Sequence, residues 1–123
     1  MHELGVASSI LETCQGAVLD QPPGRIVRVR LRLGELATVE PELLAFAWQA
    51  VTADGPHAGS QLDVEWCLAE QHCPSCGEAK PRREGGWLRE CPDCGGVLRL
   101  RGGTQIEVVE LSYETEDLRA EGR

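Results

Sequence analysis

The 123-residue chain lacks several features that would place it in a common functional class. A membrane-spanning helix needs about 20 consecutive apolar residues, and no such run occurs. The first residues do not form a basic segment followed by an apolar one, so we expect no secretory signal and predict a cytoplasmic protein. The phosphate-binding motif G-x-x-x-x-G-K-[ST] is also missing, which argues against a GTP-binding role.

The chain has little positive charge to offer a nucleic acid. Its formal net charge is −8 at pH 7. Residues 71–101 include six basic and four acidic residues, a local charge of +2, which leaves −10 for the rest. Four thiolates around one divalent ion would add about −2 and cancel that local excess. Neither part offers the positive field that phosphate backbones require, so we expect neither a nucleic acid nor a membrane as partner.

Two segments have helical patterns. From Glu3 to about Leu19, apolar residues recur at three- and four-residue steps, which predicts one buried stripe of Leu4, Ala7, Leu11, Cys14 and Val18. A second helix is expected to begin at Pro41, because proline and flanking acidic residues suit a first helical turn. The sequence Asp54-Gly55-Pro56 should end it.

Three segments alternate with the period of a β-strand: Ile26 to Leu33, Leu62 to Leu68 and Gln105 to Tyr113. In the first, one face should carry Val27, Val29, Leu31 and Leu33, and the other should carry Arg28, Arg30 and Arg32. We expect these arginines to pair across strands with Asp63, Glu65 and Glu107. The third alternation slips between Val108 and Val109, which indicates a bulge or a two-sided strand.

These patterns predict an α+β fold, in which a three-stranded sheet carries two helices on one face and a zinc-ribbon-like module with four cysteines is inserted. The predicted boundaries are 1–70 and 102–116 for the α+β domain, 71–101 for the cysteine module and 117–123 for a flexible tail. An exposed edge strand would leave a homodimer formed by strand exchange open.

The strongest chemical signal is a pair of C-x-x-C motifs, Cys73-Pro-Ser-Cys76-Gly77 and Cys91-Pro-Asp-Cys94-Gly95. Two intervening residues let both thiolates of a pair converge on one ion, and the following glycine can adopt a positive φ. Four thiolates fill the tetrahedral coordination of zinc and leave no position for water, so we predict a structural site. Iron in the same geometry remains an alternative.

Disulfides and redox chemistry are the main alternatives to metal binding. A disulfide framework is not expected in a reducing cytoplasm. A redox C-x-x-C pair typically accompanies a βαβ unit, and we expect no such unit here. Cys14 should pack in the core, and Cys67 has no assigned role.

The N-terminus offers a second candidate metal site. The Met1 amine, the His2 amide nitrogen and the His2 imidazole can form adjacent chelate rings, and the Glu3 amide could complete a plane of nitrogen donors. Such a plane favours Ni²⁺ or Cu²⁺. A histidine at position 2 is weak evidence by itself, and His57 and His72 are weaker candidates.

The combination resembles the HypA/HybF family. The resemblance is carried by Met1-His2-Glu3-Leu4, by the segment Leu33-Gly-Glu-Leu-Ala-Thr-Val-Glu-Pro-Glu-Leu-Leu44, and by two C-P-x-C-G pairs before Ile106-Glu107-Val108. It implies a protein that is not an enzyme and that delivers nickel for [NiFe]-hydrogenase maturation, in some members also for urease. His2 would be the essential nickel ligand, with the Met1 amine, nearby backbone and the acidic Glu3 in support.

The resemblance further implies Cys73, Cys76, Cys91 and Cys94 as zinc ligands. The implied partners are a HypB-type GTPase and the hydrogenase large-subunit precursor. Two other functions stay open. A zinc-ribbon module that binds protein or nucleic acid would explain the cysteines but not the N-terminus. A small metalloenzyme would need an open metal position with a general base, which only His2-Glu3 could approach.

Overall fold

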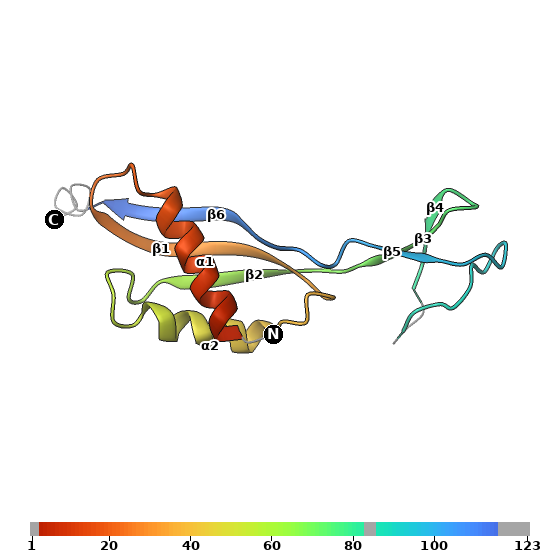
Figure 1. Ribbon diagram of the computed structural model, residues 1–123, viewed down its shortest axis with the longest axis horizontal. Helices are drawn as coiled ribbons and strands as arrows, with labels where there is room; N and C mark the ends of the chain where they lie inside the picture. The colour runs from red at the N-terminus through yellow and green to blue at the C-terminus, as the bar shows by residue number, and fades with distance from the viewer. Residues whose placement is uncertain (1–2, 83–85, 116–123) are drawn as a thin grey trace.

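The computed structural model describes residues 3–82 and 86–115. Its elements are α1 (Glu3–Ala17), β1 (Gly24–Gly34), α2 (Pro41–Thr52), β2 (Gln61–Cys67), β3 (Glu70–Cys73), β4 (Glu78–Lys80), β5 (Arg99–Arg101) and β6 (Ile106–Thr115). The strands form two three-stranded sheets, ordered β2-β1-β6 and β4-β3-β5. Figure 1 shows an elongated molecule with the first sheet and both helices at one end and the second sheet at the other.

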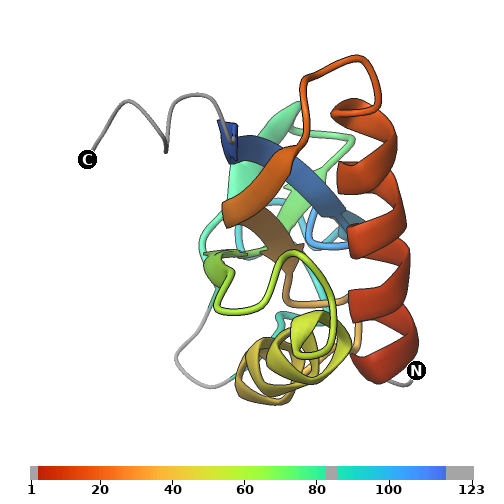
Figure 2. The ribbon, with the colours of Figure 1, turned by 90° about the vertical axis from the view of Figure 1, so that its left-hand side faces the viewer.

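The larger sheet carries both helices on one face, as Figure 2 shows along the long axis. The core between them combines apolar residues of α1, β1 and α2, and the largest fully buried side chain is Trp48. The predicted α+β fold with an inserted four-cysteine, zinc-ribbon-like module is therefore confirmed. The exact domain boundaries stay a prediction. Neither α1 nor α2, the helices of the described residues, is long and apolar enough to cross a bilayer.

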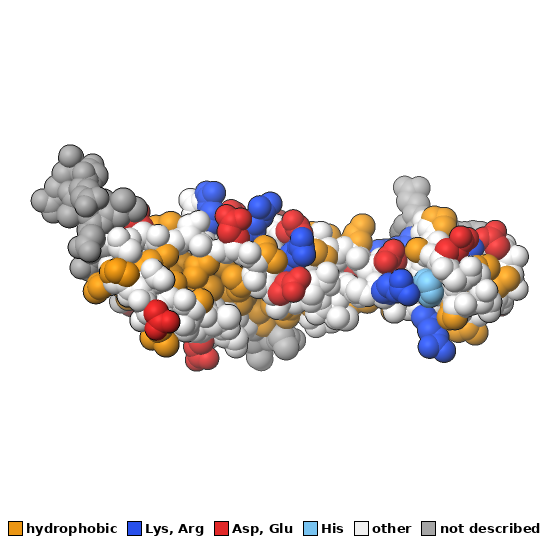
Figure 3. Space-filling view, turned by 90° about the horizontal axis from the view of Figure 1, so that it is seen from above, with side chains coloured by type: hydrophobic (Ala, Val, Ile, Leu, Met, Phe, Trp, Pro, Cys, Tyr) orange, Lys and Arg blue, Asp and Glu red, His pale blue; other side chains and the backbone are white. Residues whose placement is uncertain are grey.

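The opposite face of the larger sheet is lined with ion pairs. Arg28 contacts Asp63 at 3.3 Å, and Arg32 lies 2.8 Å from Glu65 and 3.8 Å from Glu107. Figure 3 shows acidic and basic side chains alternating here. The predicted cross-strand pairs are confirmed for Arg28 and Arg32, whereas Arg30 lies 4.0 Å from Glu110 instead. Because these side chains are about half exposed, each pair contributes little stability.

The connection between the first two strands differs from the sequence prediction. β1 and β2 are parallel neighbours, joined by α2. The segment is therefore a βαβ unit, and the expectation that the chain contains none was wrong. Residue periodicity marks a strand but carries no information about its direction, which tertiary packing decides. The case against a redox pair consequently rests on the cysteine cluster itself.

Two irregularities in β1 and β6 change which side chains face the core. The register shift between Arg30 and Leu31 leaves Val109 unpaired, so the predicted bulge in β6 is confirmed. A second shift, between Ile26 and Arg28, buries Ile26 and leaves Val27 only partly buried. The prediction that Val27 lies on the core face was therefore wrong.

The buried stripe of α1 differs from the predicted one. The buried residues are Val6, Ala7, Ile10 and Cys14, whereas Leu4 is 55% exposed. Adjacent apolar pairs such as Ile10 and Leu11 allow two phases of the helical stripe, and contact with the sheet selects one. The helix ends at Ala17, earlier than predicted.

His57 is a structural residue rather than a ligand. It is buried, and its Nδ1 accepts a hydrogen bond from the backbone N–H of Ile26 at 2.9 Å. Burial and the neighbouring Arg25 lower the pKa of His57. The imidazole is therefore neutral at pH 7 and holds the loop before β2 against β1.

The loop after β1 joins the two sheets. The N–H of Gly34 bonds the Gln105 carbonyl at 2.7 Å, and the N–H of Leu36 bonds the Gly103 carbonyl at 2.6 Å. The Glu35 carboxylate accepts hydrogen bonds from the Ala69 N–H at 2.8 Å and from Arg82 at 2.5 Å. The two chain segments that lead into and out of the cysteine module, residues 71–101, are therefore both hydrogen-bonded to this loop.

Replacing Gly34 with alanine is expected to destabilise the protein by about 2–3 kcal/mol, because overpacking against backbone atoms cannot relax cheaply. A Cβ on Gly34 would lie 2.1 Å from the Gly103 carbonyl oxygen. Gly16→Ala is the matched control: it lies in α1 with nothing within 4 Å, and should be stabilising by up to about 1 kcal/mol. Urea unfolding measures both, and equal midpoints for Gly34→Ala and the wild type would contradict the tight junction.

Candidate metal centres

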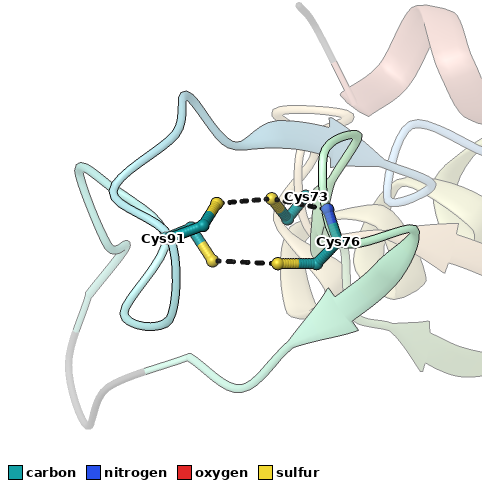
Figure 4. Close-up of side chains that lie close together, drawn as sticks. Cys73, Cys76 and Cys91 are labelled. Atoms are coloured by element: carbon teal, nitrogen blue, oxygen red, sulfur yellow. Dashed lines mark hydrogen bonds between the residues drawn. The ribbon is translucent and has the colours of Figure 1, made fainter.

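The four cysteines of the two C-x-x-C motifs form one cluster. Their sulfur atoms all lie within 4.8 Å of one another, and no other cluster of this kind occurs among residues 3–82 and 86–115. Cys73 ends β3, and Cys76 lies in the turn that leads to β4. Cys91 faces Cys73 and Cys76 from the opposite side in Figure 4, and Cys94, from the same loop as Cys91, contacts Cys73. Cys73 and Cys91 are buried, and Cys76 and Cys94 are exposed.

The cluster has the dimensions of a tetrahedral thiolate site. Cys73 Sγ lies 3.6 Å from Cys94 Sγ, and Cys76 Sγ lies 3.9 Å from Cys91 Sγ. Zinc–sulfur bonds of about 2.3 Å in a tetrahedron place sulfurs about 3.8 Å apart. The residues present therefore fit a zinc ion.

The two cysteine loops, Cys73–Gly77 and Cys91–Gly95, have the same backbone geometry. Gly77 and Gly95 have φ angles of 74° and 73°, as predicted from the sequence. Each glycine N–H bonds the carbonyl of the first cysteine in its loop, at 2.8 Å and 2.9 Å. A side chain would strain these left-handed positions, which explains the glycine after each second cysteine.

Burial and hydrogen bonding give the thiols of the cluster unequal pKa values. Burial raises the pKa of Cys91, but hydrogen bonds from the backbone of Asp93 and Cys94 outweigh it and bring this pKa to about 7. Hydrogen bonds with Cys94 and Cys73 raise the pKa of Cys76 to about 12. Four thiolates at this separation therefore need a divalent cation to ionise together.

The two remaining cysteines lie outside the cluster. Cys14 is buried in the core, as predicted, and burial raises the pKa of its thiol. Cys67 is partly exposed at the end of β2, with its Sγ 3.7 Å from the Glu65 carbonyl.

Of the predicted nickel ligands, Met1 and His2 lie outside the described residues, and Glu3 is the first residue of α1. The Glu3 carboxylate accepts a hydrogen bond from the backbone N–H of Glu40 at 3.2 Å. Glu40 is the N-cap of α2. The beginnings of both helices are therefore adjacent, away from β3, β4 and β5 in Figure 1. In the sequence, Glu40 indicates only the start of a helix; its proximity to Glu3 depends on the fold and was not predicted.

Comparison with known proteins places nearly the whole chain in one family. Residues 1–113 match the family model described as hydrogenase/urease nickel incorporation, metallochaperone, HypA. The hydrogenase maturation factor HypA of Albidiferax ferrireducens is 34% identical over 115 residues, which cover 93% of this chain and 100% of the relative. That of Methylocella silvestris is 33% identical over the same shares of both chains.

Solved structures agree on the fold. The solution structure of the Ni metallochaperone HypA from Helicobacter pylori has a TM-score of 0.64 and 22% sequence identity, and the match covers 94% of this chain and 100% of that one. A second solution structure of a HypA protein has a TM-score of 0.68. Given the family match over residues 1–113, the chain belongs to the HypA family of hydrogenase/urease nickel-incorporation metallochaperones.

Proposed function

We propose that this chain binds Ni²⁺ at its N-terminus and delivers it for the maturation of [NiFe]-hydrogenase. The observation that carries the proposal is the family match over residues 1–113, which spans both the Met1-His2-Glu3 sequence and the four cysteines. The hydrogenase maturation factors that resemble the chain support the same role. Urease is a further candidate client.

The proposed nickel ligands are the Met1 amine, the amide nitrogen and imidazole of His2, and the backbone of Glu3. Together these donors can form a nitrogen plane, which suits a d⁸ ion. The Glu3 carboxylate, which bonds the Glu40 N–H, would hold the start of α1 in place. A site with one imidazole at a chain end can be remodelled by a partner, which suits a carrier better than a catalyst.

The four cysteines are proposed to hold a structural zinc ion. The sulfur separations of 3.6 Å and 3.9 Å support this assignment, and four thiolates leave no open position for a substrate. The ion would stabilise the cysteine module, whose residues are absent from the apolar core described above.

The proposed partners are a HypB-type GTPase and the precursor of the hydrogenase large subunit. The sequence contains no P-loop motif, so nucleotide hydrolysis would come from the GTPase. In the larger sheet, β2 and β6 each leave one edge unpaired within the described residues, which keeps a homodimer formed by strand pairing as a prediction.

Blocking the N-terminal amine tests this function. The untagged protein and a variant with Gly-Ser placed before Met1 are purified, their N-termini are verified by intact mass, and metals are measured before and after nickel titration. We expect one zinc per chain in both proteins and tight nickel binding only in the untagged one. Equal nickel binding by both would overturn the N-terminal site, and no binding by either would overturn the carrier function.

A further inference from the structure

A single buried lysine connects the two halves of the cysteine cluster. Lys80 ends β4, directly after the first cysteine loop, and its side chain is only 3% exposed. Its Nζ lies 2.6 Å from the Asp93 carboxylate and 2.7 Å from that of Glu78. Asp93 lies between Cys91 and Cys94, within the second loop. The ammonium group therefore joins β4 to the loop that supplies two of the four sulfurs.

Few other side-chain contacts hold the second loop in place. Gln71 bonds the backbone of Leu88 on the approach to this loop, with both its N–H donor and its carbonyl oxygen at 2.8 Å. Within the described residues, one side-chain hydrogen bond joins β4 to the second loop, and it is the one from Lys80 to Asp93. Further attachment comes from the sulfur atoms and from β5, which follows this loop and pairs with β3.

The charges around the cluster give the ammonium a second role. Zinc with four thiolates has a net charge of about −2, and Asp93 and Glu78 add two carboxylates nearby. Among the ion pairs of the described residues, the two formed by Lys80 place a cation beside this negative charge. A buried ammonium retains its charge only with such partners, so its position and the position of the loop depend on each other.

We propose that Lys80 is a positioning residue for the zinc site, which holds the second cysteine loop against β4 and slows the release of the ion. The proposal rests on the assignment of zinc to the four cysteines. Residues that orient metal ligands typically account for 10–100-fold in metal affinity. Because the carboxylates of Glu78 and Asp93 are 65% and 66% exposed, water screens part of the interaction, and we expect the lower end of that range.

The experiment measures the rate of zinc transfer from the purified protein to a chromogenic chelator at pH 7. Lys80→Met keeps the length of the side chain and removes its charge, and we expect release about tenfold faster than in the wild type. Asp93→Asn removes the carboxylate charge from the same ion pair, on its exposed side, and should behave alike. Because the two changes remove one shared interaction, the double variant should be no faster than either single one.

Two further variants separate positioning from general destabilisation. Lys80→Arg keeps the charge and should restore most of the wild-type rate. Arg99→Met removes an exposed β5 cation that has no ion pair in the described part of the chain, and it should leave the rate unchanged. If Lys80→Met does not fold, Asp93→Asn and its comparison with Arg99→Met decide the question.

The outcomes distinguish the new proposal from the one on which it rests. A wild type without zinc would overturn the zinc assignment and this inference with it. A wild type with zinc, together with wild-type release rates in Lys80→Met and Asp93→Asn, would overturn the role of Lys80 alone. A double variant whose increase in rate is the product of the two single increases would also overturn it, because independent effects indicate no shared contact.

Discussion

Replacing His2 with alanine is expected to abolish tight nickel binding and to leave the zinc content unchanged. In the proposed site the imidazole is the only side-chain donor, and it closes the chelate ring next to the backbone amide. Mutation of a residue that only orients a metal ligand typically lowers metal affinity 10–100-fold, and loss of a direct ligand should lower nickel affinity by more than that. Isothermal titration with Ni²⁺, on untagged protein of verified N-terminus, measures the change.

Two substitutions serve as controls for His2→Ala. His72→Ala removes a partly exposed histidine of β3, far along the chain from Met1, and should retain nickel binding. Glu3→Gln keeps an oxygen that can accept the hydrogen bond from Glu40, so we expect a smaller loss than with His2→Ala. Wild-type affinity in the His2→Ala protein would remove the basis for the N-terminal site.

Local sequence signals predicted the elements whose ends are fixed by local chemistry. Pro41 marks the first residue of α2, because proline tolerates the first helical turn and lacks the N–H that later turns need. The slip at Val109 was likewise visible, because a bulge breaks the period-two alternation of its own strand. The four cysteines were recognisable because their spacing is itself the requirement for a shared ion.

Features that depend on contacts between distant segments were not predictable in this way. The parallel pairing of β1 with β2 and the phase of the α1 stripe both follow from how α1 and α2 pack on the sheet. Lys80 was one basic residue among six in its segment, and only folding brings it to Asp93. The short strands β3, β4 and β5 have too few alternating residues to give a periodic signal.

Replacing Cys73 with serine is expected to release the zinc ion and unfold the cysteine module, while the larger sheet and its helices keep their structure. The apolar core comprises residues of α1, β1, α2, β2, β6 and the loop between β1 and α2, and no residue of β3, β4 or β5 belongs to it. Structural zinc contributes about 10–16 kcal/mol of apparent binding free energy, which small modules use in place of a core. Without the ion, little apolar burial offsets the conformational entropy of residues 71–101.

Hydrogen–deuterium exchange of the Cys73→Ser protein provides the measurement. Peptides from β3, β4 and β5 should lose protection, and peptides from β1 and α2 should exchange as in the wild type, because Trp48 and its neighbours pack independently of the module. Cys67→Ser is the matched control, since this thiol lies outside the cluster and its removal should change neither zinc content nor exchange. Retained zinc and protection in Cys73→Ser would show that the ion is not what holds the module. Loss of protection throughout the chain would show that the larger sheet and its two helices depend on the cysteine module, through the hydrogen bonds at Glu35 and Gly34.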